Sequence, residues 1–408
     1  MNNHKPQYQQ CLDWIDTTAP ALREELLRLS DINSGSFNAA GVSTVAQRMA
    51  ERFAPLGGRQ ELPDVAPFRS TADDGSERER PLGRALHIRM RADAPLRIFF
   101  CGHLDTVFGA EHPFQKAREV NADTLHGPGI ADLKGGLLAM WLALAALERS
   151  PWKERIGWEV LLNPDEEIGS LGSAPLLAQA AKRNHFGLVY EPAFPDGNLA
   201  AARKGSGNFD VIAHGRAAHA GRDFGAGRNA IVACADFIRD LNALNGARDE
   251  LTINPGYVRG GGALNIVPEL CVFKFNVRTA KPDDEGWMRQ QLEQLLARAN
   301  QRDGFRFELR GGFTRPTKPV SPGMQNLMQL VDDCGRQLGL SLQFKPTGGC
   351  CDGNNLAAHG LPNLDNLGVV GGEIHSDREF MRFSSLAERA KLSALLLLRL
   401  ASGELTWT

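Results

Sequence analysis

Residues 96–107 read LRIFFCGHLDTV, an apolar run that ends in a histidine and an aspartate. A short run of this kind, rich in branched and aromatic residues, predicts a buried β-strand. The next long apolar segment, Gly135 to Arg149, is rich in Leu and Ala and apolar nearly all round, which predicts a helix packed on a sheet. A strand followed by such a helix is typical of an α/β domain with a largely parallel sheet.

The same pattern continues along the chain and is then interrupted. Further strands are expected at Trp158–Leu162, Phe186–Tyr190 and Asn366–Val370. Between Asn208 and Arg315 the expected order changes to strand, helix, two strands, helix and strand, which is the order of a ferredoxin-like unit. The charged stretch Ser70–Arg84 is expected to be an exposed hairpin tip or loop without chemistry.

The length of the chain also favours two domains, because 408 residues exceed what one hydrophobic core usually organises. We therefore predict an α/β catalytic domain with a mixed, largely parallel sheet, interrupted by an α+β lid. The catalytic domain comprises residues 1–205 and 317–408, and the lid comprises residues 206–316.

The composition is that of a soluble globular enzyme, with 42% hydrophobic and 23% charged residues. A net charge of -2 gives no electrostatic reason to expect nucleic acid or a membrane as partner. The polar N-terminus lacks the basic start and apolar run of a secretory signal, so a cytoplasmic location is expected. Leu392–Leu400 is too short for a membrane helix, and the seven cysteines are expected to be reduced thiols.

Polar side chains follow the predicted strands directly. The residues are His103 and Asp105 after the first strand, Asp165, Glu166 and Glu167 after the second, Glu191 at the end of the third, and His375 after the fourth. Because ligands bind at the carboxyl ends of strands in open α/β sheets, we expect these side chains to share one crevice. Asp132, in a Gly-rich loop before the predicted helix, can reach the same place.

Two histidines and several carboxylates without thiolates suit zinc, with cobalt or manganese as plausible substitutes. Two ions that share a carboxylate fit the number of ligands better than one. Of the neighbours Glu166 and Glu167, one can ligate while the other accepts a proton from water. Each residue also has a structural alternative: Asp132 could cap the helix, and the two glutamates could be solvated loop charges.

Seven ordered motifs run along nearly the whole chain: GHLDTV (102–107), GPGIADLKGG (127–136), NPDEEIGSLGS (163–173), GRAAHAG (215–221), NIVPE (265–269), TGGCCDGN (347–354) and GGEIHSD (371–377). Through these motifs the chain resembles the M20 family of metallopeptidases, most closely its glutamate carboxypeptidase group. The resemblance implies a zinc-peptidase-like catalytic domain with an inserted ferredoxin-like lid and dimerisation domain.

The resemblance also implies a role for each residue of the crevice. His103 and Glu191 would bind one zinc ion, Glu167 and His375 the other, and Asp132 would bridge the two. Asp105 would orient His103, and Glu166 would be the general acid/base. The peptide bond Asp132–Leu133 would be cis.

In the lid, the resemblance implies that His219 reaches across a dimer to stabilise the oxyanion of the reaction. Arg278 and Asn265 would hold a substrate carboxylate, and Gly349 would lie in the substrate-binding segment. The alternatives are a lid core histidine for His219 and an ordinary exposed strand cation for Arg278. Cys350 and its neighbour Cys351 depart from the small residues expected there, which leaves the released amino acid open.

The resemblance therefore predicts a di-zinc hydrolase that cleaves a peptidyl or N-acyl amino acid with a free C-terminal carboxylate, as a homodimer formed through the lid. Its expected partner is a small molecule or short peptide. The alternatives are an aminoacylase or other deacylase of the same family, and a catalytically silent binding protein on the same fold.

Overall fold

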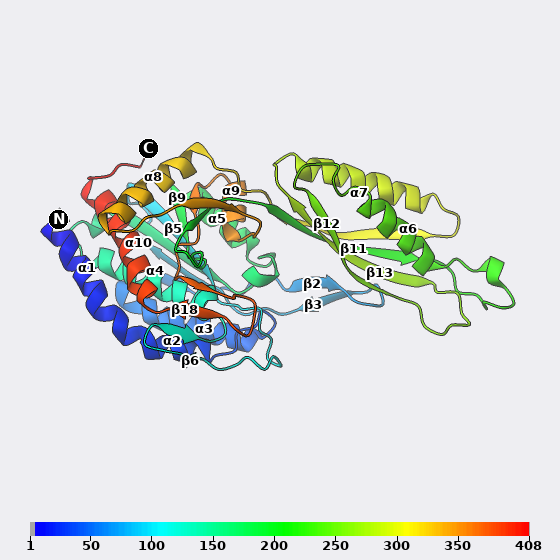
Figure 1. Ribbon diagram of the computed structural model, residues 1–408, viewed down its shortest axis with the longest axis horizontal. Coiled ribbons are helices and arrows are strands. Elements are labelled where there is room, and N and C mark those ends of the chain that lie inside the picture. The colour runs from blue at the N-terminus through cyan, green and yellow to red at the C-terminus, as the bar shows by residue number, and fades with distance from the viewer. Residues whose placement is uncertain (1–4, 408) are drawn as a thin grey trace.

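The structure, a computed structural model, describes residues 5–407 and consists of two parts side by side (Figure 1). The larger part contains a six-stranded sheet in the order β1–β4–β8–β5–β9–β16. Its strands are β1 (Arg59–Glu61), β4 (Leu86–Met90), β5 (Leu96–His103), β8 (Ile156–Asn163), β9 (Phe186–Val189) and β16 (Asn363–Leu364). The β8–β5–β9–β16 pairings are parallel and those of β1 and β4 antiparallel. The predicted mixed, largely parallel sheet is thus confirmed.

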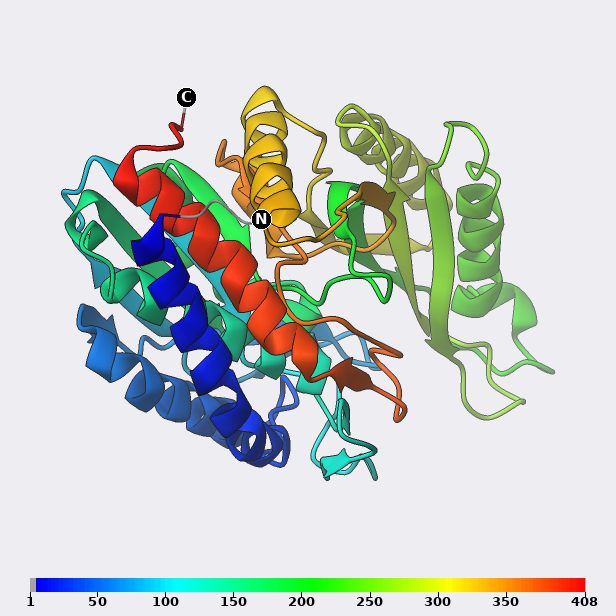
Figure 2. The same ribbon diagram turned by 60° about the vertical axis from the view of Figure 1, so that its left-hand side comes forward.

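Helices cover both faces of this sheet. One face packs against α1 (Pro6–Thr18), α2 (Arg23–Ser30), α3 (Ala39–Phe53), α4 (Gly136–Glu148), α8 (Pro322–Gln337) and α10 (Ser384–Ser402), and the other against α5 (Ala174–Arg183) and α9 (Asp352–Ala358). In β5, Ile98 and Phe100 point into the first core and Phe99 and Cys101 into the second, as strand alternation requires. Figure 2 shows α1 and α10, from the two ends of the chain, lying side by side.

The predicted helix Gly135–Arg149 is confirmed as α4, which is buried nearly all round. Within the described residues, Ile130–Glu148 is the one stretch long and apolar enough to cross a membrane by length and composition, and it is buried inside the protein. The expected cytoplasmic location and the expected absence of membrane and nucleic-acid partners stay predictions.

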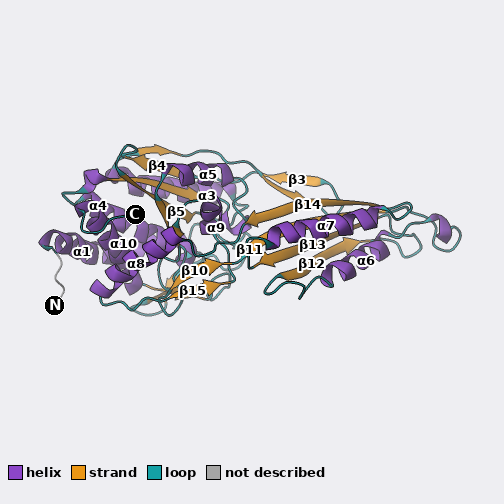
Figure 3. Ribbon diagram, turned by 90° about the horizontal axis from the view of Figure 1, so that it is seen from above, coloured by secondary structure: helices purple, strands orange, loops and turns teal. Residues whose placement is uncertain are grey.

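The smaller part, here called the inserted unit (Gly205–Arg315), has the ferredoxin-like order predicted for it. Its elements are β11 (Gly205–His214), α6 (Ala230–Asn242), β12 (Thr252–Gly260), β13 (Leu270–Thr279), α7 (Asp284–Asn300) and β14 (Arg306–Arg315). The antiparallel sheet runs β12–β13–β11–β14, and both helices lie on one face of it (Figure 3). The division of the chain into domains at residues 205 and 316, and the action of this unit as a lid, stay predictions.

A hairpin of the larger part reaches the inserted unit (Figure 1). It consists of β2 (Phe68–Thr71) and β3 (Glu77–Arg80) and overlaps the stretch Ser70–Arg84, which we expected to be an exposed hairpin tip or loop. The Tyr257 hydroxyl donates to Asp73 Oδ1 at 2.5 Å, and Lys274 Nζ donates to the carbonyl of Thr71 at 2.5 Å. The hairpin is therefore a third link between the two parts, beside the two chain crossings.

The predicted strand Asn366–Val370 is wrong. Asn366 has a φ of 63°, in the left-handed region, and cannot continue an extended strand. The strand that joins the sheet is β16, just before it, which pairs with β9.

The remaining strands form small separate sheets. A four-stranded sheet contains β17 (Gly371–Gly372), β18 (Phe380–Arg382), β7 (Thr124–His126) and β6 (Arg118–Glu119), and a parallel pair contains β10 (Leu199–Arg203) and β15 (Phe344–Thr347). All seven cysteines are free thiols, as predicted.

Candidate metal centre

Three neighbouring strands deliver polar side chains to one edge of the six-stranded sheet. His103 is the last residue of β5, and Glu191 comes two residues after β9 ends. Glu166 and Glu167 begin a single helical turn, Glu166–Ile168, three residues after the end of β8. Because β5 runs parallel to both β8 and β9, the carboxyl ends of these strands meet at the same edge.

Two further side chains reach this edge from outside the sheet. Asp132 lies in the turn Ile130–Gly135 directly before α4, and the Asp132–Leu133 peptide bond is cis, as the resemblance implied. His375 lies between β17 and β18, in the part of the chain that follows the inserted unit. Segments far apart in the sequence therefore converge on the edge.

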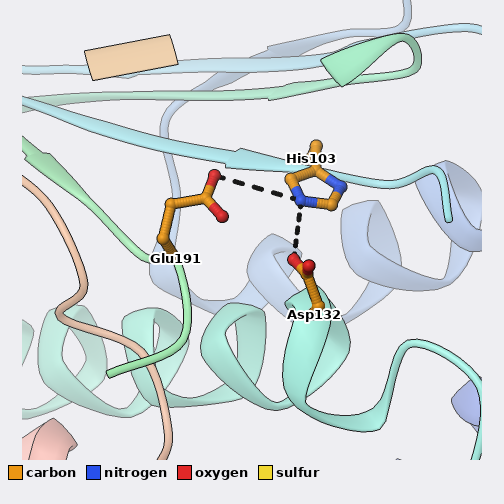
Figure 4. A group of neighbouring side chains, drawn as sticks. All are labelled: His103, Asp132 and Glu191. Atoms are coloured by element: carbon orange, nitrogen blue, oxygen red, sulfur yellow. Dashed lines mark hydrogen bonds and ion pairs between the residues drawn. The ribbon is translucent and has the colours of Figure 1, made fainter. Parts of the chain in front are cut away.

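His103, Asp132 and Glu191 form the first group of candidate ligands, and all three are buried (Figure 4). The Nε2 atom of His103 lies 3.2 Å from Asp132 Oδ1 and 4.0 Å from Glu191 Oε1. Both carboxylates thus face the same ring nitrogen, as ligands around one cation would.

Asp132 also belongs to a second group, with Glu167 and His375. The Nε2 atom of His375 lies 3.3 Å from Asp132 Oδ2 and 3.2 Å from Glu167 Oε2. The side chain of His375 is 53% exposed, whereas that of Asp132 is 6% exposed, so the second group opens toward solvent. Asp132 presents one carboxylate oxygen to each group, which is the arrangement of a bridging ligand.

The electrostatics of the two groups favour bound cations. Burial raises the pKa of Glu191 to about 8, and the charge of Asp132 adds to this rise. Burial, and then the charge of Asp132, also raise the pKa of Glu167. Hydrogen bonds to Asp132 and Glu167 raise the pKa of His375 to about 11. Buried carboxylates need nearby positive charge, and these have too little of it. With the imidazole nitrogens, and without a thiolate, they form a donor set that fits two divalent cations.

Asp105 joins the first group to the turn that carries Glu166 and Glu167. Its backbone carbonyl lies 2.9 Å from His103 Nδ1, and its carboxylate Oδ1 lies 3.4 Å from the same nitrogen. The carboxylate accepts hydrogen bonds from the backbone N–H groups of Glu166 (3.1 Å) and Glu167 (3.2 Å), and from the Ser36 hydroxyl (2.6 Å). Asp105 therefore fixes both a histidine ring and the adjacent glutamate pair.

Glu166 lies beside the two groups and forms an ion pair with Arg315. Arg315 Nη2 donates to Glu166 Oε1 at 2.8 Å and to the Glu166 carbonyl at 2.9 Å. Burial raises the pKa of Glu166 well above its usual value, while the charge of Arg315 opposes this rise. The carboxyl group therefore holds a proton more readily in this environment than it would in water.

Glu379 holds the turn that carries Asp132. Its side chain is buried, and it accepts hydrogen bonds from three backbone N–H groups: Oε2 from Gly129 (3.0 Å), and Oε1 from Ala131 (2.9 Å) and Asp132 (3.0 Å). The segment that supplies His375 therefore also anchors the backbone of the shared ligand candidate.

The residues predicted for substrate contacts lie outside these groups. His219 and Asn265 are exposed neighbours within the inserted unit, where the Ala220 N–H donates to the Asn265 carbonyl at 2.9 Å. Arg278, near the end of β13, donates from Nη1 to Cys350 Sγ at 3.2 Å, across the boundary between the two parts. Gly349 is exposed and accepts a hydrogen bond from a buried arginine at its carbonyl.

Sequence reasoning missed three residues of this region, namely Ser36, Arg315 and Glu379. Arg315 stands directly before a proline at the return from the inserted unit, and Glu379 follows His375 by four residues. Only the nearness of Glu379 to the GGEIHSD motif was a usable signal, since the partners of all three residues are distant in the sequence.

Comparison with known proteins shows which family the chain belongs to. The sequence model of peptidase family M20/M25/M40 matches residues 99–399. The chain is 27% identical to carboxypeptidase G2 of Pseudomonas sp. over 94% of its own length and 90% of that protein. It is 25% identical to succinyl-diaminopimelate desuccinylase of Verminephrobacter eiseniae over 83% of its length and 87% of that protein.

Solved structures agree at the level of the fold. The crystal structure of aminopeptidase PepT from Bacillus cereus superposes with a TM-score of 0.69 at 22% identity, covering 94% of this chain and 99% of that one. The family match spans β5 to α10 and contains all five candidate ligands of the two groups. This chain therefore belongs to peptidase family M20/M25/M40 and is a metal-dependent hydrolase.

Proposed function

We propose that this protein hydrolyses the amide bond of a peptidyl or N-acyl amino acid with a free C-terminal carboxylate, as a glutamate carboxypeptidase-like exopeptidase. The observation that carries the proposal is the position of Asp132, whose two carboxylate oxygens face two separate groups of ligand candidates. Two zinc ions bound there would polarise the scissile carbonyl and lower the pKa of a shared water to about 7. Cobalt or manganese could replace zinc in such a donor set.

The ligands divide between the two ions as the two groups do. His103 and Glu191 would hold one ion and Glu167 and His375 the other, with Asp132 available to both. Asp105 keeps His103 in orientation through the contacts at Nδ1, which leaves Nε2 as the ligating nitrogen.

Glu166 is the general acid/base. It takes a proton from the attacking water and returns it to the leaving amine, a role for which a carboxyl group with a raised pKa is suited. Its backbone N–H is held by Asp105, so the carboxyl group stays beside the ligands while it exchanges the proton.

Arg278 binds the free carboxylate of the substrate. Its guanidinium is half-buried and donates to the Cys350 thiol, which is a weak acceptor. A carboxylate forms shorter, charge-assisted and often bidentate hydrogen bonds with arginine, so it would displace the thiol from this donor. Asn265 and Gly349 are proposed as further substrate contacts on the resemblance alone.

His219 stabilises the developing oxyanion from a second subunit. Its Nδ1 accepts hydrogen bonds from the backbone N–H groups of Gly221 and Arg222, both at 3.1 Å, so the neutral ring carries its proton on Nε2. That exposed N–H is the donor an oxyanion needs. The hydrogen bonds of His219 lie within the inserted unit and not at the metal groups. The proposal therefore includes a homodimer formed through this unit, in which His219 of one subunit reaches the metal groups of the other.

Apolar side chains on the inserted unit support such a dimer. Exposed fractions are 55% for Val232 on α6, 58% for Val258 on the edge strand β12, 100% for Leu264 and 48% for Ile266. An unpaired strand edge with exposed apolar side chains is a surface that another chain can cover.

A deacylase of the same family is the second candidate. A cavity of about 490 Å³ beside Glu167 is lined in part by Phe37, Val107 and Ile168, and these apolar walls suit an acyl chain. The similarity to a desuccinylase also favours this candidate.

The test is turnover of the zinc-reconstituted protein on a matched panel of N-acyl amino acids and C-terminal glutamyl dipeptides, with a chelator control. Chelator-sensitive release of glutamate supports the exopeptidase, and a preference for short acyl groups supports the deacylase. Absence of turnover by the zinc-loaded protein on every compound would overturn both.

Glu166→Gln tests the mechanism within the same assay. We expect a loss of roughly a hundredfold to ten-thousandfold in kcat with zinc content unchanged. The matched control is Glu111→Gln, the same substitution at an exposed glutamate, which should leave kcat unaltered.

A further inference from the structure

Arg315 is the last residue of β14 and is 4% exposed. Besides its two hydrogen bonds to Glu166, it donates from Nη2 to the Ser170 hydroxyl at 2.9 Å. Its other terminal nitrogen, Nη1, donates to Asp352 Oδ1 at 2.6 Å and to Asn355 Oδ1 at 2.9 Å. One guanidinium thus joins the turn of Glu166 to the beginning of α9.

We infer that Arg315 is a positioning residue that fixes the carboxyl group of Glu166 for proton transfer. Arg315 holds both the side-chain oxygen Oε1 and the backbone carbonyl of Glu166, so the side chain and its turn are fixed together. Within the described residues 5–407, the second oxygen, Oε2, has no hydrogen-bond partner. One oxygen is therefore held and the other is left to exchange a proton. The inference rests on the proposed role of Glu166.

The geometry requires an arginine. The two terminal nitrogens of the planar guanidinium reach two carboxylates on different elements, Glu166 and Asp352. A lysine ammonium is a point charge on a flexible stem and cannot hold both carboxylates in the same fork geometry. Lysine at position 315 would keep the positive charge but lose the fixed orientation, which separates an effect of charge from an effect of position.

The position of Arg315 in the chain gives the contact a second consequence. Its backbone pairs with Ser206 in the sheet of the inserted unit, while its side chain lies in the larger part. A change in the orientation of the inserted unit therefore acts on Glu166 through this one side chain. Proton transfer by Glu166 is thereby coupled to the placement of the unit that carries Arg278.

The first experiment measures kcat and KM of the zinc-loaded Arg315→Lys and Arg315→Met variants on the best substrate of the panel. We expect kcat to fall about a hundredfold, as a misplacement of about 1 Å does, with KM within about threefold of wild type and zinc content unchanged. The matched control is Arg91, a partly buried arginine (side chain 12% exposed) whose Nη1 donates to Glu148 at 3.1 Å, away from the metal groups. Arg91→Lys should leave kcat within about twofold. Unchanged kcat in Arg315→Lys would overturn the inference.

A second experiment needs no turnover and compares the melting temperatures of Arg315→Met, Glu166→Gln and the double variant. Because the two side chains bond to each other, we expect the loss in the double variant to be clearly smaller than the sum of the two single losses. Additive losses would overturn the inference even if kcat falls. If the wild-type protein cleaves nothing, the proposed function fails, while this thermal cycle still decides whether Arg315 and Glu166 act as a pair. If Arg315→Met does not fold, Arg315→Lys takes its place in the cycle.

Discussion

Replacing Glu379 with glutamine should weaken zinc binding although Glu379 is not itself a ligand candidate. The carboxylate accepts three backbone N–H groups, one on Oε2 and two on Oε1, from the turn that presents Asp132. In glutamine, one of the two terminal atoms is an amide nitrogen that donates and cannot accept. At least one backbone N–H of the turn then faces a donor and loses its hydrogen bond inside the protein.

The expected size of the effect follows from these contacts. A hydrogen bond to a charged group contributes about 1.5–3 kcal/mol, and a buried donor left without a partner costs about 1–3 kcal/mol. We therefore expect Glu379→Gln to lower the free energy of unfolding by roughly 2–4 kcal/mol. Because the displaced turn carries the ligand shared by both groups, zinc affinity should fall by about 10- to 100-fold.

The assay is competition for zinc against a chromophoric chelator. It is best run at pH 8, because burial, and then the charge of Asp132, raise the pKa of Glu379 to about 7. The control is Glu373→Gln, the same substitution at an exposed glutamate of the same segment, which should change zinc affinity by less than about twofold. Wild-type zinc affinity in Glu379→Gln would refute the reasoning. A loss of stability without a loss of zinc affinity would show that the position of the turn does not determine how Asp132 binds zinc.

Four further outcomes are expected. Burial would raise the pKa of Glu159, but hydrogen bonds lower it from 4.5 to about 2. This group therefore contributes about 3 kcal/mol to the free energy of unfolding above pH 4.5, and the contribution is lost as the pH falls toward 2. In urea unfolding, the free energy of unfolding of Glu159→Gln should match that of wild type only at the acid end of this range. Tyr257→Phe removes the hydroxyl that bonds to Asp73 and should speed amide hydrogen exchange in the β2–β3 hairpin, whereas unaltered exchange would show that the contact does not hold it. Val258→Asp on the edge strand β12 should yield a folded monomer in sedimentation experiments, and a persisting dimer would place the interface elsewhere. Zinc at about 100 times its dissociation constant should stabilise the protein by about 2.7 kcal/mol over the chelator-treated form in calorimetry, and equal melting temperatures would contradict a cation site.

The ligand candidates were predictable because they depend on a local rule. His103 and Glu191 each follow an apolar strand at its carboxyl end, and parallel strands bring those ends together whatever the details of packing. Asp132 was expected at this edge from its Gly-rich loop and His375 from the strand predicted at Asn366–Val370; that strand is wrong, yet the structure puts the two side chains within 3.3 Å of each other. Short-range pattern and sheet topology were therefore sufficient for His103 and Glu191, but not for His375, which lies between β17 and β18 of a separate sheet.

The supporting residues were not predictable in this way. Arg315 is 149 positions from Glu166, and Glu379 is 250 positions from Gly129, so no local spacing marks either contact. The Asn366–Val370 run was misassigned for the opposite reason, since its composition is that of a strand, while its first residue is left-handed and Val370 forms an isolated bridge with Ala193. Sequence patterns identify the side chains that carry chemistry, whereas the groups that hold them in place emerge only from the folded chain.

The same distinction explains why the substrate cannot be ranked from the motifs. The two groups of ligand candidates lie in the larger part, while Arg278 extends from β13 of the inserted unit. In the proposed function, a substrate places its carboxylate at Arg278 and its scissile carbonyl at the metal groups, so the distance between these points would set the size of the released residue. That distance depends on the orientation of the inserted unit, which the Arg315 contacts and the β2–β3 hairpin hold. Under the proposed function, substrate selection would therefore depend on the placement of one unit against the other, and we expect loosening these links to change it more than replacing single pocket residues does.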